Sequence, residues 1–174
     1  MNLNYCPVCG TKLHPKEQPH EAPALYCDRC AEYRFPIYSA AVAVTVLDEA
    51  GENMILIRQY GDPDPVLVAG YIEKSETAEE AVIREVNEEL GMTVQRLSFL
   101  RSRYYAPSET LMFHYAATVK GKTAAPNWEV DNWEWVPVEH ALELVKPGGL
   151  AETLLLTMRN IEGAEPDANP CIFD

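Results

Sequence analysis

The sequence predicts an α/β domain preceded by a small cysteine-rich segment. Three observations lead to this prediction: two CxxC pairs near the N-terminus, a series of short apolar runs separated by turn residues, and one amphipathic helix rich in glutamate. The chain has 174 residues, the length of one ordinary domain, and its 47% of hydrophobic residues suffice for a core. We expect two parts, residues 1–36 and residues 37–174.

The charge and the apolar runs argue against several classes of partner. With 14 basic and 27 acidic residues, the net charge of −13 disfavours nucleic acid and anionic lipid as partners. The longest apolar runs, such as residues 40–47, fall short of the ~18–20 residues that a membrane-spanning helix needs. The first residues show no secretory signal, so we expect a cytoplasmic protein. A small phosphate ligand held through metal ions stays compatible with this charge.

The paired cysteines of the first part predict a zinc ribbon. They are Cys6, Cys9, Cys27 and Cys30, with 17 residues between the two pairs. Four thiolates can surround one tetrahedral Zn²⁺ and leave no open position for water, which makes the metal structural. Zinc binding would supply the folding free energy that a segment with several prolines and few aliphatic residues cannot obtain from burial.

Other interpretations of the cysteines stay open. Two disulfides, or a redox-active CxxC, fit the same residues, although the presence of two pairs and a reducing cytosol favour zinc. His14 and His20 lie between the pairs and are alternative ligands. Cys171 lies in the tail after Glu162, which we expect to be irregular, and is interpreted as a free thiol.

After residue 39, short apolar runs bounded by turn residues predict strands. These runs are residues 40–47, 54–57, 66–68, 93–100, 111–119 and 133–136. A helix is predicted from Thr77 to Leu90, because Thr77 and Glu80 form a capping box and Gly91 stands at the expected C-cap. Two further helices are expected at residues 138–145 and 151–160, separated by a Pro-Gly-Gly sequence.

The predicted helix lies in a segment with an unusual density of negative charge. Seven glutamates but only two basic residues occur between Glu73 and Glu89. Around the helix, Glu85 lies about 40° from Glu89 and about 60° from Glu88. Like charges at this spacing repel, and hard divalent cations relieve the repulsion by taking carboxylate oxygens. A solvated helix face is the alternative. The spacing favours a Mg²⁺ site, and Mg²⁺ also binds substrate phosphates, which points to a pyrophosphate substrate.

The residues around this helix resemble the Nudix box. Gly70 is followed, after five intervening residues, by Glu76 and then, after seven more intervening residues, by Arg84-Glu85-Val86-Asn87-Glu88-Glu89-Leu90-Gly91-Met92. The resemblance implies the Nudix fold, a mixed β-sheet between helices, with a loop-helix-loop that binds Mg²⁺ or Mn²⁺. It also implies hydrolysis of a nucleoside diphosphate linked to another moiety, a small-molecule nucleotide substrate.

The resemblance also assigns roles to individual residues. Glu85 and Glu89 would be the main metal ligands, and Glu88 an additional ligand or a group that orients water. The backbone carbonyl of Ala69 would be a further ligand. Arg84 and Glu76 would form an internal salt bridge that fixes the loop on the helix.

The order of further motifs resembles the NADH pyrophosphatase branch. A four-cysteine ribbon is followed by Tyr33-Arg34-Phe35-Pro36 and then by Ala69-Gly70-Tyr71-Ile72-Glu73. Phe35 matches an aromatic residue that packs on substrate in that branch, and a core position beside Pro36 is the alternative. Glu129, six residues before Trp135, matches a late metal-binding glutamate, and an exposed loop charge is its alternative. Homodimers are usual among similar proteins, so the resemblance also implies a homodimer.

One segment departs from that branch. Its Pro- and Trp-rich signature SQPWPFPxS is replaced here by residues 102–110, and Pro107 lies 15 residues after Met92, as in ADP-ribose pyrophosphatases. Tyr104 and Tyr105 are either stacking partners for a base or residues of a half-buried strand edge. We interpret Trp128, together with Trp133 and Trp135, as a core or interface residue.

These inferences predict a Mg²⁺- or Mn²⁺-dependent hydrolase that acts on NADH, NAD⁺ or ADP-ribose. The products would be AMP and either nicotinamide mononucleotide or ribose 5-phosphate. Glu88 and Glu129 are both candidates for the general base, and the sequence leaves the choice open. A nucleotide sensor with a Nudix fold and no catalysis is the alternative, and the intact Nudix box counts against it.

Overall fold

The computed structural model describes residues 3–162, which fall into two compact units. The first unit runs to Ser39 and includes Ala106–Thr110, whereas the second covers Ala40–Tyr105 and continues from Leu111. Our expectations for Cys171 and for an irregular tail after Glu162 concern residues outside this described part. Among residues 3–162, no helix is long and apolar enough to cross a membrane.

The first unit is a small antiparallel sheet of three strands. These are β1 (His14–Gln18), β2 (Glu21–Cys27) and β3 (Glu32–Arg34), in the order β1-β2-β3. The sequence analysis did not predict these strands, because they contain two prolines and little apolar alternation. The buried hydrophobic cluster consists of Cys6, Leu13 and Cys27, so two of its three members are the predicted metal ligands.

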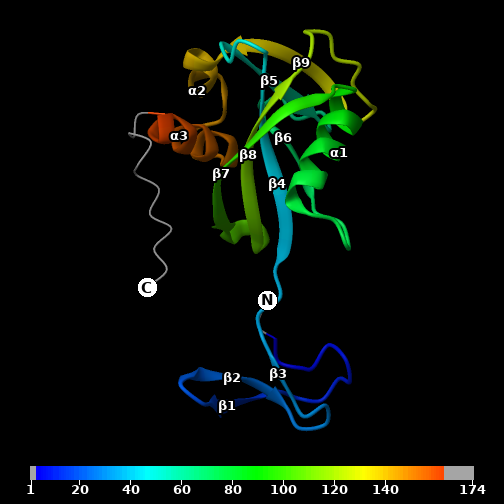
Figure 1. Cartoon of the computed structure of the whole chain (residues 1–174), viewed down its shortest axis with the longest axis vertical. Coiled ribbons are helices and arrows are strands. Elements are labelled where there is room, and N and C mark those ends of the chain that lie inside the picture. The colour runs from blue at the N-terminus through cyan, green and yellow to red at the C-terminus, as the bar shows by residue number, and fades with distance from the viewer. Residues whose placement is uncertain (1–2, 163–174) are drawn as a thin grey trace. The chain divides into compact units, whose positions relative to one another are not determined.

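The second unit is a mixed six-stranded sheet between helices, as predicted. The strands are β4 (Ser39–Leu47), β5 (Asn53–Gln59), β6 (Val68–Tyr71), β7 (Val94–Tyr105), β8 (Thr110–Val119) and β9 (Val130–Pro137). Their order is β7-β8-β4-β5-β9, and β6 pairs with β4. The helices are α1 (Ala78–Leu90), α2 (Ala141–Leu144) and α3 (Leu150–Glu162). Figure 1 shows α1 on one face of the sheet and α2 and α3 on the other.

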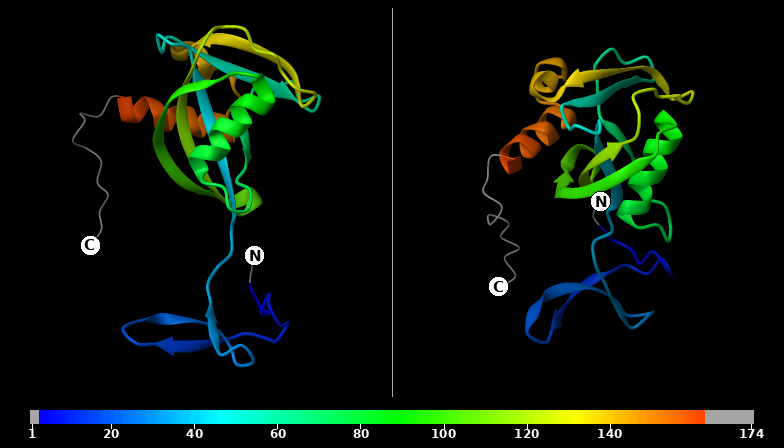
Figure 2. Two further views of the ribbon diagram at one scale, coloured as in Figure 1. Left: turned by 45° about the vertical axis from the view of Figure 1, so that its right-hand side comes forward. Right: turned by 45° about the horizontal axis from the view of Figure 1, so that its top comes forward.

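Alternation along β4 builds a core on each face of the sheet. Val42, Val44 and Val46 are fully buried in the cluster that includes the apolar residues of α1. Ala41 and Ala43 belong to the cluster that includes α2 and α3. Because successive side chains of a strand point to opposite faces, a continuous apolar run indicates a strand covered on both sides. The two views of Figure 2 show the same arrangement of helices around the sheet.

Three predicted elements differ from the structure. The apolar run at residues 66–68 becomes a strand only at Val68, while Val66 forms an isolated bridge with Ile57. The strand expected at 93–100 continues to Tyr105. The helix expected at 138–145 is a 3₁₀ turn followed by the four residues of α2, and it ends where Val145 adopts an extended backbone.

Candidate active site

Helix α1 places two carboxylates in a buried position. Its N-terminus is fixed by the predicted capping box, in which Thr77 and Glu80 bond each other's backbone, and Gly91 ends it with a left-handed φ of +63°. One turn apart on this helix, Glu85 is 8% exposed and Glu89 is 3% exposed. Most charged residues on a helix face solvent, so two buried glutamates require an explanation from their surroundings.

Strand β6 explains why Glu85 lies where it does. Gly70 pairs with Val42 of β4, so its backbone is fixed in the sheet. A Cβ atom at Gly70 would overlap the carboxylate of Glu85. Only glycine therefore allows this carboxylate to approach the backbone of β6, which gives the glycine of the Nudix box a steric role.

Arg84 ties the loop before the helix to the carboxylates on it. Its guanidinium binds Glu76 through two bonds, Nε–Oε1 at 2.8 Å and Nη2–Oε2 at 3.0 Å. Nη1 donates to Glu85 Oε1 at 2.7 Å and to Glu88 Oε2 at 3.1 Å, and Nη2 donates to the Tyr71 carbonyl at 3.0 Å. A planar guanidinium suits several carboxylates at once, because its donors point in fixed directions. Arg84 thus sets the geometry of the loop and of Glu85 together.

Glu89 has the strongest electrostatic signature in the site. Burial is the main cause that raises its pKa to about 8, and the charges of Glu85 and Glu129 add to the effect, against a bond from the Ala69 backbone. Burial also raises the pKa of Glu85, although Arg84 opposes the shift. Within the described residues, Glu89 Oε2 is buried without a hydrogen-bond partner. A buried carboxylate oxygen with no donor, beside other carboxylates, fits a hard divalent cation.

A fourth carboxylate comes from a distant part of the chain. Glu129 lies in the turn before β9, where its N–H donates to Asn127 Oδ1 at 2.9 Å. The Asn127 N–H in turn donates to the Glu89 carbonyl at 3.3 Å, so this turn is attached to the end of α1. Glu129 lies close enough to raise the pKa of both Glu85 and Glu89. The negative charges of three carboxylates on α1 and one in this turn therefore act on one another.

One residue near these carboxylates, Tyr60, was not predicted from the sequence. Burial is the main cause that raises the pKa of Tyr60, and the negative charges of Glu129, Glu89 and Glu85 act in the same direction. Tyr60 lies 69 residues before Glu129 in the sequence (129 − 60). The pairing of β5 with β9 brings these two segments together. No local pattern around Tyr60 indicates such a pairing, so only the fold could reveal it.

The four cysteines of the first unit form a second possible metal centre. Their Sγ atoms all lie within 4.8 Å of one another, with Cys6–Cys30 at 3.9 Å and Cys9–Cys27 at 3.5 Å. Thiolates bound at ~2.3 Å around a tetrahedral zinc are about 3.8 Å apart. A disulfide needs about 2.05 Å, and all four cysteines are free. The spacing therefore fits zinc and disagrees with the disulfide alternative.

The neighbours of Cys6 and Cys9 favour the thiolate form, whereas hydrogen bonds with the other cysteines and burial raise the pKa of Cys30 to about 12. Burial opposes ionisation of Cys6, but hydrogen bonds from Arg34 and from the backbone N–H groups of Val8 and Cys9 outweigh it and lower the pKa of Cys6 to about 6. A metal ligand must be deprotonated, so such donors suit a zinc site. His14 instead binds the carboxylate of Asp28 at 3.1 Å, which leaves the four cysteines as the grouped ligands.

Comparison with known proteins assigns the family. The model described as NUDIX domain matches residues 37–156, more than half of the chain. The chain belongs to the NUDIX domain family. The family expected from the Nudix box is thereby confirmed, and the match begins just after the cysteine ribbon ends.

Individual relatives agree with this assignment. The chain is 27% identical over 158 residues to the NAD-capped RNA hydrolase NudC of Vibrio atlanticus, and 28% over 167 residues to that of Pseudomonas aeruginosa. These alignments cover 88% and 93% of this chain but only 56% and 58% of the relatives. The chain thus spans little more than half the length of these relatives.

Solved structures support the Nudix fold. A NUDIX hydrolase from Nitrosomonas europaea superposes with a TM-score of 0.64 at 16% identity, covering 94% of each chain. The NUDIX domain of Shewanella oneidensis NrtR gives a TM-score of 0.61 at 15% identity, covering 79% of this chain and 94% of that one. At such low identities the likeness concerns the fold alone.

The predicted substrate-binding residues are not gathered in one place of the Nudix unit. Tyr104 is 48% exposed near the end of β7, while Tyr105 packs into the cluster of α2 and α3. Phe35 is exposed and, like Pro107, belongs to the first unit, so a role for both on substrate stays a prediction. Trp128 is 81% exposed, so it does not lie in the core, and an interface position for it stays a prediction.

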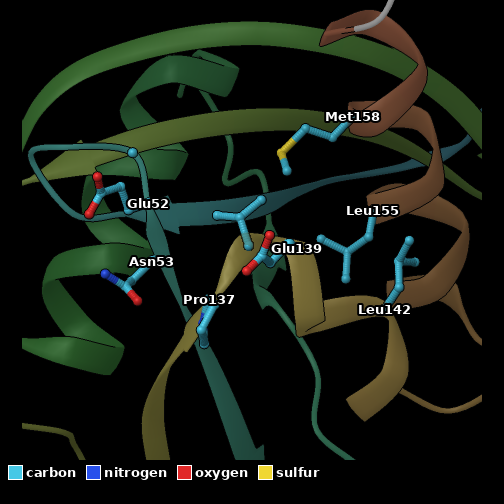
Figure 3. Close-up of a pocket in the computed structure, with 9 residues that line it drawn as sticks. Glu52, Asn53, Pro137, Glu139, Leu142, Leu155 and Met158 are labelled. Carbon is cyan, nitrogen blue, oxygen red and sulfur yellow. The ribbon is translucent and has the colours of Figure 1, made fainter.

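A cavity in the Nudix unit lies away from the carboxylates. It has a volume of about 620 Å³ and is lined by residues from the β4–β5 turn, the end of β9, α2 and α3. Figure 3 shows Glu52 and Asn53 on one side and Leu142, Leu155 and Met158 on the other. None of the four clustered carboxylates is among its lining residues. The cavity and the carboxylates are therefore two separate features of the Nudix unit.

Proposed function

We propose that the chain is a divalent-cation-dependent pyrophosphohydrolase that cleaves a nucleoside diphosphate linked to another moiety. The observation that carries this proposal is the buried carboxylate pair Glu85 and Glu89, in which Glu89 Oε2 has no hydrogen-bond donor among residues 3–162. A non-catalytic fold has no reason to keep two buried, mutually repelling carboxylates, because burial of an unpaired charge is costly. The alternative of a nucleotide sensor without catalysis explains this arrangement less well.

The residues of the site have different proposed roles in metal binding, ligand orientation and proton transfer. Glu85, Glu89 and Glu129, with Glu88 and the Ala69 carbonyl, would hold Mg²⁺ or Mn²⁺. When bound, such ions lower the pKa of water and neutralise charge on phosphoryl oxygens. Arg84 keeps Glu85 oriented through its bond at 2.7 Å, and Glu76 anchors Arg84 in turn. Glu88 and Glu129 both stay candidates for accepting the proton of the attacking water, because each lies in the cluster and neither is fully buried.

The proposed substrates are NADH or NAD⁺ and ADP-ribose. Relatives described as NAD-capped RNA hydrolases favour an NAD-type substrate, and the replaced Pro/Trp signature at residues 102–110 favours weak discrimination. Both compounds contain an ADP half, so only polar groups at the other half can distinguish them. We expect hydrolysis of both, with kcat/KM values within ~100-fold of each other, giving AMP and the second phosphate product.

A substrate panel tests this proposal. The purified chain is incubated with NADH, NAD⁺, ADP-ribose, an NAD-capped RNA oligonucleotide and nucleoside triphosphates, with Mg²⁺, with Mn²⁺ or with EDTA, and the products are resolved by chromatography. Cleavage of NADH and ADP-ribose to AMP, abolished by EDTA, is the expected result. Cleavage of triphosphates alone would refute the substrate class. Binding of ADP-ribose without turnover of any compound would establish the sensor alternative.

We also propose the organisation of the chain. Residues 1–36 would be a structural zinc ribbon and residues 37–174 a Nudix hydrolase domain, with two chains forming a homodimer. The homodimer rests on resemblance to similar proteins, and light scattering after size-exclusion chromatography tests it. A mass equal to one chain across micromolar concentrations would refute this part.

A further inference from the structure

Arg34, the last residue of β3, keeps a charged side chain inside the cysteine ribbon. The side chain is only 13% exposed. Arginine is rarely buried to this extent without a partner, because removal of a charge from water is costly. The burial of this guanidinium therefore requires an explanation from the groups around it.

The register of the small sheet places Arg34 on the face that carries the cysteines. Across the antiparallel strands β2 and β3, Arg34 pairs with Leu25, and Glu32 pairs with Cys27. Paired residues of such strands direct their side chains to the same face of the sheet, and so do residues two apart on one strand. Cys27 is a member of the hydrophobic cluster of the ribbon, and Leu25 packs against that cluster. The side chain of Arg34 is thus directed to the same face as this cluster.

Three hydrogen bonds fix the guanidinium of Arg34. Its Nε donates to Cys6 Sγ at 3.3 Å, although the two residues are 28 positions apart in the sequence. Its Nη1 donates to Glu32 Oε2 at 2.6 Å and to the Tyr33 carbonyl at 3.2 Å. Because the donors of a guanidinium point in fixed directions, the two bonds of Nη1 orient the Nε–H toward the sulfur. The Glu32 side chain is itself 64% exposed, so water screens the attraction between these two charges.

The negative charge of a zinc–thiolate group explains the position of this cation. Four thiolates around one Zn²⁺ leave two net negative charges, whereas four neutral thiols would leave none. In the part of the chain that the structure describes, Nη2 of Arg34 is also buried without a hydrogen-bond partner. A buried donor without an acceptor is unfavourable, and negative charge nearby compensates for it. The four cysteines are the groups in contact with Arg34 that supply such charge when zinc is bound.

We propose that Arg34 is a positioning residue of the zinc ribbon, which orients Cys6 Sγ and balances part of the negative charge of the zinc–thiolate group. This inference rests on the proposed zinc ribbon and is independent of the proposed hydrolase activity. A hydrogen bond between an ionised donor and a thiolate is stronger than one between neutral groups. Residues that hold metal ligands in this way typically contribute 10- to 100-fold to metal affinity, so the effect is measurable.

The first test is the affinity of the whole chain for Zn²⁺, measured at fixed pH by competition with a chromogenic chelator. Arg34→Gln removes the charge and the Nε donor, and we expect it to weaken Zn²⁺ binding about 10-fold. Arg34→Lys keeps the charge but lacks the planar set of donors, so its affinity should lie between the two. The matched control is Arg29→Gln, which removes the same charge from an exposed arginine between Cys27 and Cys30 and should keep the wild-type affinity.

Replacement of zinc by Co²⁺ gives a readout that a merely structural role would not change. A hydrogen bond to sulfur stabilises the sulfur lone pairs, so charge transfer from thiolate to cobalt requires more energy. We expect Arg34→Gln to shift this absorption band to longer wavelength, while the d–d bands keep the intensity of a tetrahedral site. Arg29→Gln should leave both sets of bands unchanged.

Hydrogen exchange of the zinc-saturated variants shows whether the ribbon still folds. If the amides of β1 and β2 stay protected in Arg34→Gln, wild-type Zn²⁺ affinity or an unchanged cobalt band would overturn the inference. Equal losses of affinity in Arg34→Gln and Arg29→Gln would also overturn it, because the contact with Cys6 would then not matter. Loss of protection in both Arg34→Gln and Arg34→Lys would assign Arg34 to the fold and have the same consequence. A wild-type chain without affinity for zinc would instead overturn the proposed zinc ribbon and leave the proposed hydrolase intact.

Discussion

The two units differ in what their buried residues are. In the first unit the hydrophobic cluster consists of Cys6, Leu13 and Cys27, two of which are predicted zinc ligands. In the second unit, aliphatic residues fill both faces of a six-stranded sheet, and the clustered carboxylates stand at the end of strands and on one face of α1. The predicted metal ligands therefore make up most of the core of the first unit, whereas in the second unit they are additional to an aliphatic core.

This difference determines what a metal ion does in each unit. A segment with so small a core cannot offset its conformational entropy by burial, so metal binding has to supply the folding free energy. The Nudix unit has its own core and instead keeps Glu89 almost fully buried, with a pKa raised to about 8. Removal of metal should thus unfold the first unit and only inactivate the second.

The largest expected effect is loss of zinc from the ribbon. Structural zinc contributes ~10–16 kcal/mol to such small units, far more than their core can supply. We predict one zinc per chain, and predict that Cys27→Ser abolishes both zinc binding and amide protection in β1, β2 and β3. Protection in β4 and β5 should be retained. Elemental analysis and hydrogen exchange measure both effects.

The matched control is Cys171→Ser, which removes a cysteine outside the two pairs. It should keep one zinc per chain. A wild-type chain without zinc, or a Cys27→Ser variant whose ribbon amides stay protected, would show that the first unit folds without metal and would remove the contrast between the units.

The second effect concerns the carboxylates of the Nudix unit. We predict that Glu89→Gln lowers kcat by about 10²–10³-fold, because removal of one group that stabilises charge in the transition state typically lowers kcat by this factor. The fold should stay intact, since an amide has the same shape and relieves repulsion from Glu85 and Glu129. The measurements are steady-state kinetics with ADP-ribose or NADH and the melting temperature without metal.

Glu143→Gln is the control, because its side chain is 75% exposed on α2 and lies outside the cluster. Its kcat should equal that of the wild type. If Glu89→Gln also kept normal turnover, the buried carboxylates would serve only the structure, and the contrast with the zinc ligands would disappear.

Local patterns in the sequence were sufficient to predict much of the fold. The capping box at Thr77, the C-cap at Gly91 and the apolar alternation of β4 are short-range features, and the structure confirms each. The CxxC pairs are equally local, because their spacing alone indicates four ligands for one ion. In each case the physical cause lies within a few residues of the pattern.

Features that depend on pairing of distant strands were not predictable in this way. Tyr60 directly follows β5 and Glu129 directly precedes β9, and these two segments meet only because β5 and β9 pair. The same limit applies to His114, because nothing near it in the sequence indicates its partner. In the fold its Nε2 lies 2.9 Å from Oγ1 of Thr45 in the neighbouring strand β4.

His114 provides the smallest of the predicted effects and tests whether the Nudix core tolerates charge. Its side chain is 1% exposed, and burial lowers its pKa from 6.5 to about 4. Within the described residues its Nδ1 is buried without a hydrogen-bond partner. No group there would therefore stabilise the positive charge of a doubly protonated imidazole. Between these two pH values the unfolded chain binds a proton on this histidine that the folded chain does not. Folding stability from this group is therefore full above pH 6.5 and is lost as the pH falls toward 4.

Glu89 acts in the opposite direction over part of the same range. Its pKa is raised to about 8, so between roughly pH 8 and its ordinary value the folded chain binds a proton that the unfolded chain does not. Stability from Glu89 is present at low pH and is lost as the pH rises through 8. The pH dependence of stability in the wild type contains the contributions of both Glu89 and His114. Only a comparison of variants separates the contribution of the histidine.

We therefore predict the effect of His114→Gln in a Glu89→Gln background, using urea unfolding from pH 7 to pH 4. With the histidine present, stability should fall by about 3 kcal/mol more over this range than without it, since each unit of pKa shift corresponds to 1.36 kcal/mol. His114→Gln can also change the free energy of unfolding at pH 7. The test therefore compares how much this free energy falls between pH 7 and pH 4 in the two variants. If the free energy of unfolding depended on pH equally in both variants, the folded core would accept a charged imidazole. The core of the Nudix unit would then be less unfavourable for charge than its burial on both faces of the sheet implies.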